Sequence, residues 1–359
     1  MTPVEERLLR RIAITGPITI AEFMAACLTD PDGYYATNEP FGVAGDFITA
    51  PEISQMFGEL IGAFLLDRWH ADGRPDAVDL VELGPGRGTL MGDILRVAAR
   101  DSGFLAASRV VLVEASPRLR ERQEAALAPL HPRIEWREAI PSDRPIYLVA
   151  NEFFDALPIR QFVHQGGRWF ERTVGRDGDR LTFGLSPFPA AMAAEAPDGG
   201  VREIRPAASA AIGEIASTIA RHRAGTALVI DYGYATDGFG ETLQAVRDHR
   251  PCDVLDRPGE ADLSAHVDFR ALAQAAKAAG ASVHGPIGQG DFLLGLGLLE
   301  RAGSLGAGAS REVQARLHGE VSRLAGDGPN EMGELFKALA ITANPTTLPG
   351  FDIVGRDCG

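Results

Sequence analysis

The stretch Val78-Asp-Leu-Val-Glu82-Leu-Gly84-Pro-Gly86-Arg-Gly88 decides the fold of this chain. Its first residues are mostly apolar, which predicts a short buried strand, and the strand runs directly into three alternating glycines. Glycine has no Cβ and adopts positive φ freely, so such a loop lets the backbone approach a ligand closely. The apolar pattern from Leu90 onward predicts a helix whose first amide groups face that ligand. The stretch therefore predicts a strand, a ligand-binding loop and a helix in succession.

The glycine spacing separates two cofactor classes. The dinucleotide fingerprint GxGxxG would need its last glycine at Thr89, and Pro85 also lies inside the turn. S-adenosylmethionine has no pyrophosphate and does not require that third glycine, so we expect it to be the cofactor. A tight glycine turn without a ligand and a nicotinamide-dependent oxidoreductase are the alternatives. The residues expected to bind the cofactor here are Gly84, Pro85, Gly86 and Gly88, with Glu82 meeting its ammonium group.

Short apolar segments alternate with helical patterns on the carboxyl side of this loop. Strands are predicted at residues 110–113, 146–150, 226–230 and 335–342. Helices are predicted at residues 90–99, 116–127 and 209–222. Buried strands that alternate with helices indicate a parallel sheet covered on both faces, which is a Rossmann-like α/β fold.

Residues 1–75 read as a helical part that precedes the sheet. Capping boxes are predicted at Thr2/Glu5, Thr19/Glu22 and Thr49/Glu52, the last of them opening a long amphipathic helix. A glycine-bearing loop is predicted at Gly42 to Asp46. The domain that contains the sheet and the glycine loop is then expected over residues 76–359.

Two insertions are expected in that domain, at about residues 160–205 and 295–330. In the first, residues 161–163, 169–173 and 180–183 alternate like strands and are separated by Gly166-Gly167 and Asp177-Gly178 turns. They predict an antiparallel insertion. In the second, residues 298–325 are predicted to be helical. Together these segments are expected to form an antiparallel and helical substrate region.

Composition narrows the class of partner. The 359 residues carry a formal net charge of −14, with 45% hydrophobic and 23% charged residues. The negative net charge argues against a nucleic-acid partner and favours a cationic substrate. No apolar run approaches the roughly 18 residues of a bilayer span, so no membrane insertion is expected.

Cysteines and histidines show no metal-binding or disulfide pattern. Cys27, Cys252 and Cys358 are widely scattered, which indicates a reducing compartment and no structural metal. The first residues lack the apolar core of a signal peptide. We expect a bacterial cytoplasmic protein with no metal site.

A second acidic position follows the predicted strand at residues 110–113. Glu114 comes one βα unit after the glycine loop, where a carboxylate can accept both ribose hydroxyls of an adenosine. A helix-capping or surface glutamate is the alternative. At the next turn, Ala139 in Glu138-Ala-Ile140 is placed at the adenine.

A third cluster, Asn151-Glu-Phe-Phe-Asp-Ala-Leu-Pro158, follows the strand at residues 146–150. Carboxylates near apolar residues are costly unless they are paired, and a guanidinium would pair Glu152 and Asp155. We expect these two carboxylates to be catalytic, orienting a nitrogen of an arginine side chain, with Asn151 among the cofactor-binding residues. The alternative is a capped loop in which Asn151 and Asp155 satisfy backbone amides.

Two further polar residues lie near strand ends. Asp231 is predicted to border the substrate cleft. His266 is one of eight histidines and is more often structural in such a setting, so no catalytic role is assigned to it.

Six stretches resemble the MidA family of methyltransferases. They are Gly45-Asp-Phe-Ile-Thr-Ala-Pro-Glu-Ile-Ser-Gln-Met-Phe-Gly-Glu59, Glu82-Leu-Gly-Pro-Gly-Arg-Gly-Thr-Leu90, Asn151-Glu-Phe-Phe-Asp-Ala-Leu-Pro158, Val229-Ile-Asp-Tyr-Gly233, Asp262-Leu-Ser-Ala-His-Val-Asp-Phe269 and Gln289-Gly-Asp-Phe292. They run over most of the chain, and the two longest are highly specific. Ala50 departs from the serine that the family often has.

The resemblance implies a class I methyltransferase sheet of seven strands, with Gly84, Gly86 and Gly88 on the cofactor and Glu114 on its ribose. It also implies that residues 46–55 close over the cofactor. Mitochondrial members are complex I assembly factors that methylate an arginine of a core complex I subunit. A protein arginine N-methyltransferase is therefore expected, with a complex I subunit as one candidate partner. A partner-binding assembly factor with this fold and a small-molecule methyltransferase stay open, as does the oligomeric state.

Overall fold

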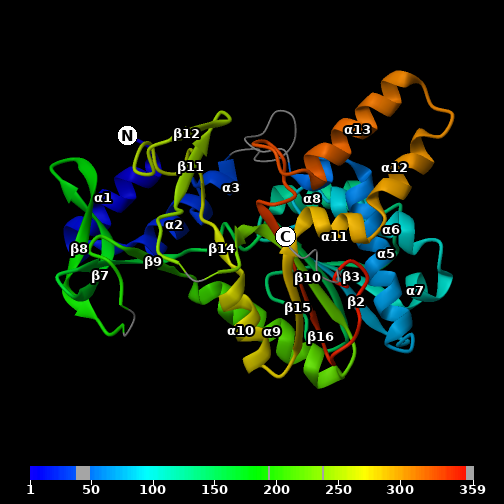
Figure 1. Cartoon of the computed structure of the whole chain (residues 1–359). Coiled ribbons are helices and arrows are strands. Elements are labelled where there is room, and N and C mark those ends of the chain that lie inside the picture. The colour runs from blue at the N-terminus through cyan, green and yellow to red at the C-terminus, as the bar shows by residue number, and fades with distance from the viewer. Residues whose placement is uncertain (38–48, 193–194, 237, 353–359) are drawn as a thin grey trace, which may run out of the picture. The chain divides into compact units, whose positions relative to one another are not determined.

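The computed structural model describes residues 1–37, 49–192, 195–236 and 238–352 (Figure 1). The predicted loop from Gly42 to Asp46 and Cys358 lie outside these ranges. The chain folds into two compact units. The small unit contains Met1–Phe47, Asp155–Ser209 and Thr236–Asp268, and the sheet unit contains Ile48–Phe154, Ala210–Ala235 and Phe269–Gly359.

The sheet unit is built on a mainly parallel sheet. Its strands run in the order β15-β16-β10-β5-β2-β3-β4, and only β16 is antiparallel to its two neighbours on this path. Their bounds are β2 (Val78–Leu83), β3 (Ser108–Val113), β4 (Ile134–Arg137), β5 (Ile146–Asn151), β10 (Thr226–Tyr234), β15 (Ser282–Gly288) and β16 (Phe336–Thr342). Every residue of β2 is buried, as expected for a central strand covered on both faces. The predicted Rossmann-like sheet is confirmed.

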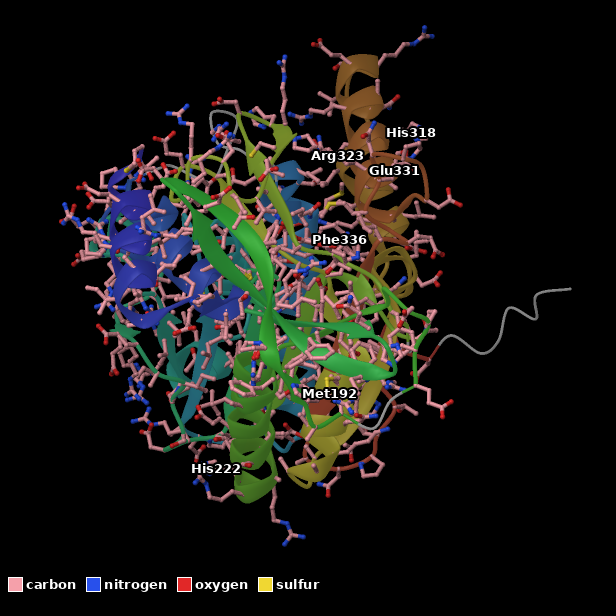
Figure 2. The ribbon with its side chains drawn as sticks, turned by 90° about the vertical axis from the view of Figure 1, so that its left-hand side faces the viewer. Met192, His222, His318, Arg323, Glu331 and Phe336 are labelled. Carbon is pink, nitrogen blue, oxygen red and sulfur yellow. The ribbon has the colours of Figure 1, made fainter. Side chains whose placement is uncertain are left out.

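Helices cover this sheet from two sides. In Figure 1, α5, α6 and α7 lie on one side of the sheet, and α9 and α10 lie on the other. The helices of this unit are α4 (Ala50–Ile53), α5 (Gln55–Ala71), α6 (Thr89–Ala98), α7 (Ser102–Ala107), α8 (Pro117–Leu127), α10 (Phe269–Ala278), α11 (Gln289–Gly295), α12 (Leu298–Gly306) and α13 (Arg311–Ala325). Most of α9 (Pro206–His222) also belongs here, and the helix ends at His222 (Figure 2). Nε2 of His222 lies 3.1 Å from the carbonyl oxygen of Ser142. The predicted helical character of residues 298–325 is confirmed.

Glycines explain why α5 belongs with the sheet. An added Cβ at Gly58 would lie 2.5 Å from the Cβ of Asp93, and one at Gly62 would lie 3.0 Å from the Cα of Ile94. These glycines let α5 pack directly on α6. α5 therefore belongs to the sheet unit, although the sequence analysis grouped its residues with the helical part at residues 1–75.

The predicted capping box at Thr49 was wrong. Thr49 makes no side-chain capping bond, and the helix is interrupted at Ser54, which has extended backbone and caps α5 by accepting from the Met56 amide at 3.2 Å. Glu52 instead accepts a hydrogen bond from a hydroxyl outside its own helix, as described below. The helix is thus two helices, α4 and α5.

The small unit combines helices with antiparallel strands. Its helices are α1 (Pro3–Thr15), α2 (Ile20–Thr29) and α3 (Tyr34–Thr37). One sheet contains β1 (Ile18–Thr19), β6 (Arg160–Gln165), β7 (Arg168–Asp177), β8 (Arg180–Ala190) and β9 (Val201–Ile204), and a second contains β11 (Gln244–Arg247), β12 (Arg250–Cys252) and β13 (Asp262–Ser264). The short β14 (Val267–Asp268) ends the unit. The predicted antiparallel insertion is confirmed by the β6–β7 and β7–β8 pairs.

Two predicted capping boxes in the small unit are confirmed. The Thr2 hydroxyl accepts from the Glu5 amide at 3.0 Å, and the Thr19 hydroxyl accepts from the Glu22 amide at 3.2 Å. Each satisfies a backbone donor that the first turn of a helix leaves free. None of the helices in the described ranges is long and apolar enough to cross a bilayer.

Candidate functional site

The glycine loop joins β2 to α6 and is left-handed at three positions. Gly84, Gly86 and Gly88 have φ values of +60°, +52° and +82°. The Gly88 amide donates to the Pro85 carbonyl at 2.8 Å, which closes the turn. A Cβ on Gly84 would lie 2.9 Å from Cδ2 of Phe153, which leaves no space for a side chain. The left-handed backbone at Gly84 also disfavours any residue other than glycine. The loop sits at the carboxyl end of β2, where ligands bind in open α/β sheets.

Glu82 lies beneath this loop with one carboxylate oxygen unpaired. The side chain is 3% exposed, and its Oε2 has no hydrogen-bond partner among the described residues. The Met91 amide donates to the carboxylate. Burial, reinforced by the charge of Glu114, raises the pKa of Glu82 to about 8. A buried carboxylate is stabilised by a cationic donor, so this position fits the ammonium group of a ligand.

Glu114 follows β3 and faces the same end of the sheet. Its amide donates to the Arg137 carbonyl at 3.1 Å, and its Oε1 accepts from the Ser116 amide at 2.8 Å. Burial is the largest effect on its pKa, which is raised. A carboxylate oxygen can accept more than one hydrogen bond, so both oxygens keep acceptor capacity for a ligand hydroxyl.

Gln123 on α8 was missed by the sequence analysis. It is fully buried, and its Nε2 donates to the Gly86 carbonyl at 2.8 Å and to Oε2 of Glu114 at 3.3 Å. Leu119, Gln123 and Leu127 are the buried residues of this helix. Their spacing of four residues is the available signal, because a polar residue at a core-facing helical position needs hydrogen-bond partners inside the protein.

The loop after β5 contains a backbone in an uncommon conformation. Glu152 has φ +50°, and its Oε1 accepts from Nδ2 of Asn151 at 3.0 Å and from the Ala50 amide at 3.2 Å. Non-glycine residues with positive φ are strained and cluster at functional sites. Asn151 thus donates to a side chain, and its buried Oδ1 has no hydrogen-bond partner in the described part of the chain. The pairing of Leu83 with Ala150 places Gly84 and Asn151 directly after neighbouring strand positions.

The short helix α4 contacts the glycine loop and the start of α6 through the side chain of Glu52. Oε1 of Glu52 accepts from the Thr89 hydroxyl at 2.7 Å, and Oε2 lies 3.5 Å from Nη1 of Arg87. With the Ala50 contact to Glu152, this ties α4 to two strand ends. The resemblance implied that residues 46–55 close over the cofactor; residues 46–48 lie outside the described ranges, and α4 touches the loop.

Two other residues predicted for the site, Ala139 and Asp155, have different surroundings from the residues above. Ala139 is exposed in the bend that follows β4. Asp155 is the first residue of its segment of the small unit, where its carbonyl accepts from the Ala265 amide at 3.1 Å and from Nη2 of Arg205 at 3.2 Å. Since Glu152 belongs to the sheet unit, the pairing of the two carboxylates stays a prediction.

His266 also lies in the small unit. Its amide donates to the Thr242 hydroxyl at 2.9 Å, its carbonyl accepts from Nη1 of Arg205 at 3.3 Å, and burial lowers the pKa of its imidazole. The described residues contain no group of three or more His, Cys, Asp or Glu that could hold a metal ion.

Asp231 holds backbone amides together at the end of β10. It is fully buried, and its two oxygens accept from the Phe154 and Tyr232 amides, both at 2.9 Å.

Replacing Asp231 with alanine would leave buried donors unsatisfied, so we expect the free energy of unfolding to fall by about 2 kcal/mol. Urea denaturation followed by circular dichroism measures this loss. Asp231→Asn retains an acceptor oxygen and should lose less; an unchanged urea midpoint in Asp231→Ala would contradict this role.

The sheet order and the glycine loop define a class: the chain is a Rossmann-like S-adenosylmethionine-dependent methyltransferase. Residues 60–287 match the model of a family described as S-adenosyl-L-methionine-dependent methyltransferases. The chain belongs to this family, and its cofactor is S-adenosylmethionine.

Similar proteins include curated relatives and a solved structure. The chain is 38% identical to the Homo sapiens protein arginine methyltransferase NDUFAF7, mitochondrial, over 95% of this chain and 83% of that protein. It is 35% identical to the Drosophila melanogaster homolog, over 94% and 84%. A Burkholderia thailandensis protein bound to S-adenosyl-homocysteine is 28% identical, with a TM-score of 0.83 over 99% of this chain and 95% of that one.

Proposed function

We propose that this enzyme methylates a side-chain nitrogen of an arginine in a protein. The observation that carries the proposal is the carboxylate of Glu152, held in a strained backbone conformation directly after β5 and next to the strand that leads into the glycine loop. The names of the relatives, protein arginine methyltransferases at 35–38% identity, support an arginine acceptor. The formal net charge of −14 also suits a cationic substrate.

The cofactor would be held by residues around the glycine loop. Its ammonium would meet Glu82, whose unpaired buried oxygen fits a cationic donor. Glu114 would accept the ribose hydroxyls, and the turn after β4 would contact the adenine. The cofactor supplies a methyl group on a positively charged sulfur. The residues proposed to bind it are Glu82, Gly84, Pro85, Gly86, Gly88, Glu114, Ala139 and Asn151.

The chain's own carboxylates would orient the acceptor. The guanidinium group of an arginine stays protonated, because its pKa lies far above neutral pH. Glu152 and Asp155 would accept its N–H hydrogen bonds and turn one nitrogen towards the methyl group. They would also stabilise the positive charge until one N–H proton of the methylated nitrogen passes to a carboxylate oxygen of the pair and from there to water. Holding the two reacting groups in line would supply most of the acceleration.

The partner is proposed to be a protein, and a respiratory complex I subunit is the first candidate that the resemblance suggests. Neither a nucleic acid nor a membrane is part of the proposal. The bacterial cytoplasm is the proposed compartment, because the three scattered cysteines show no disulfide pattern and so indicate a reducing environment.

Glu152→Gln tests the proposed catalytic role. Glutamine keeps the size of the side chain but removes the charge that would stabilise a guanidinium, so we expect methyl transfer to fall about 100-fold or more. Binding of S-adenosylhomocysteine should change less than about three-fold, since this ligand carries no acceptor. Transfer of labelled methyl groups and calorimetry measure the two quantities. Glu121→Gln, an exposed glutamate on α8, is the matched control.

The acceptor itself is identified from the modified product. The purified enzyme is incubated with labelled S-adenosylmethionine and bacterial protein extract, and the labelled protein is hydrolysed to amino acids. We expect the label in methylarginine. Label in another amino acid, or only in small molecules, would contradict arginine as the acceptor and leave the methyltransferase class intact.

The result that would contradict the catalytic role of Glu152 is full methyl transfer by the Glu152→Gln variant.

A further inference from the structure

Gln123 joins three parts of the site through one buried amide. Its Nε2 donates to the carbonyl of Gly86 in the glycine loop and to Oε2 of Glu114 after β3. Its Oε1 accepts from Nε1 of Trp136 on β4 at 2.8 Å. The side chain is fully buried, and its Cγ would lie 3.6 Å from a Cβ on Gly88.

We propose that Gln123 is a positioning residue that fixes the Glu114 carboxylate for the two ribose hydroxyls of the cofactor and locks it to the glycine loop. This proposal rests on the contact between Glu114 and the ribose that was proposed above. Gln123 would act on binding only through Glu114, with the Gly86 carbonyl as the fixed anchor of its amide, and it would not touch the cofactor.

The chemistry of the three partners requires an amide at this position. An indole N–H can only donate, so Trp136 fixes which end of the amide is the oxygen. The two Nε2 hydrogens then point to two acceptors, the Gly86 carbonyl and the Glu114 carboxylate. A glutamate would offer no donor to either acceptor, and methionine would offer neither a donor nor a strong acceptor.

The position of Gln123 on its helix also favours a functional role. Leu119 and Leu127 share its buried face, and a leucine at residue 123 would pack there without any need for partners. A buried amide is tolerated only when its hydrogen bonds are made, and it adds little net stability over an apolar residue. What the amide adds here is a fixed orientation of Glu114, whose other oxygen is already held by the Ser116 amide.

The test compares two ligands: S-adenosylhomocysteine and its analogue that lacks both ribose hydroxyls. Calorimetry measures the affinity of each for the parent protein and for Gln123→Met, which keeps the volume of the side chain. A hydrogen bond to a charged group is lost in the variant, so we expect S-adenosylhomocysteine to bind about ten-fold more weakly. The dideoxy analogue should lose less than about two-fold, because it makes no use of Glu114.

Gln289→Met is the matched control. Gln289 is a fully buried glutamine of the same unit whose Nε2 donates to the Leu324 carbonyl at 2.8 Å. It should lose stability without changing either affinity. If Gln123→Met does not fold, Gln123→Asn, which keeps the amide but shortens it, is titrated in its place with the same expected pattern.

Each outcome decides the proposal. A loss confined to the ligand with ribose hydroxyls supports it. Equal losses for both ligands would show that Gln123 supports only the glycine loop, and unchanged affinity for both would show no role in binding; either result overturns it. Equal affinity of the parent protein for the two ligands would overturn the ribose contact of Glu114 and this proposal with it, while leaving the methyltransferase assignment and the arginine acceptor untouched.

Discussion

Glu82→Gln is expected to weaken S-adenosylmethionine binding by about 100-fold and, at pH 8, to make the free protein more stable. Both effects come from the buried carboxylate whose Oε2 has no partner in the described residues. With the cofactor present, its ammonium would pair with that carboxylate, so removing the charge weakens binding. Without the cofactor, the charge is a cost to the fold.

The pH dependence of stability follows from the direction of the pKa shift. Burial raises the pKa of Glu82 from its ordinary value to about 8 in the folded protein. Between these two pKa values the folded state holds a proton that the unfolded state has released, so the free energy of unfolding falls as the pH rises. The loss is complete above about pH 8 and is on the order of 5 kcal/mol. Glutamine does not titrate and avoids this loss.

Thermal melts at pH 5 and pH 8 measure the stability change, and calorimetry measures the affinity. The pH 5 melt is the internal control, because Glu82 is protonated in the folded state there and glutamine resembles that form. A variant that melts above the parent at pH 8, with little difference at pH 5, supports the account. A variant that binds the cofactor as tightly as the parent would show that Glu82 does not meet its ammonium group.

Gly84→Val is expected to abolish measurable cofactor binding, a loss of about 100-fold or more, while the protein stays folded. A β-branched residue strongly disfavours the left-handed backbone that Gly84 adopts at φ +60°. The new Cβ would also lie 2.9 Å from the ring of Phe153. The loop must then move away from the position that brings its backbone to the cofactor. Calorimetric titration with S-adenosylmethionine measures the loss.

Gly73→Val is the matched control for this variant. Gly73 has φ +83° just after α5, and no atom lies within 4 Å of an added Cβ. A valine at residue 73 therefore strains the backbone to a similar degree in the same unit, but it does not touch the glycine loop. We expect normal binding in Gly73→Val and none in Gly84→Val. Equal affinities in the two variants would mean that the shape of the loop does not determine binding.

Local sequence signals predicted the sheet and its loop well. The glycines after Leu83 and the mostly apolar, buried cores of β2 and β5 identify strands that end at a ligand site. β4 was not predicted, because its four residues are only partly buried and mix charged with apolar side chains. The position of β16 between β10 and β15 depends on pairings across the whole chain, which no local pattern contains.

Several contacts of the site could not be read from the sequence. Thr49 and Glu52 have the spacing of a capping box, but the Thr89 hydroxyl donates to Glu52 instead. That contact joins residues 37 positions apart and exists only after α4 meets the glycine loop. Gln123 left a weak signal, a polar residue on an apolar helix face, but its three partners come from three other segments.

Calorimetric titration of the purified protein with S-adenosylmethionine tests the central claim most directly, with NADH as the control ligand and Gly84→Val beside the parent. We expect the parent to bind S-adenosylmethionine at a single site, to ignore NADH, and to lose binding in the variant. Absence of S-adenosylmethionine binding by protein shown to be folded, or binding of NADH in its place, would contradict the account.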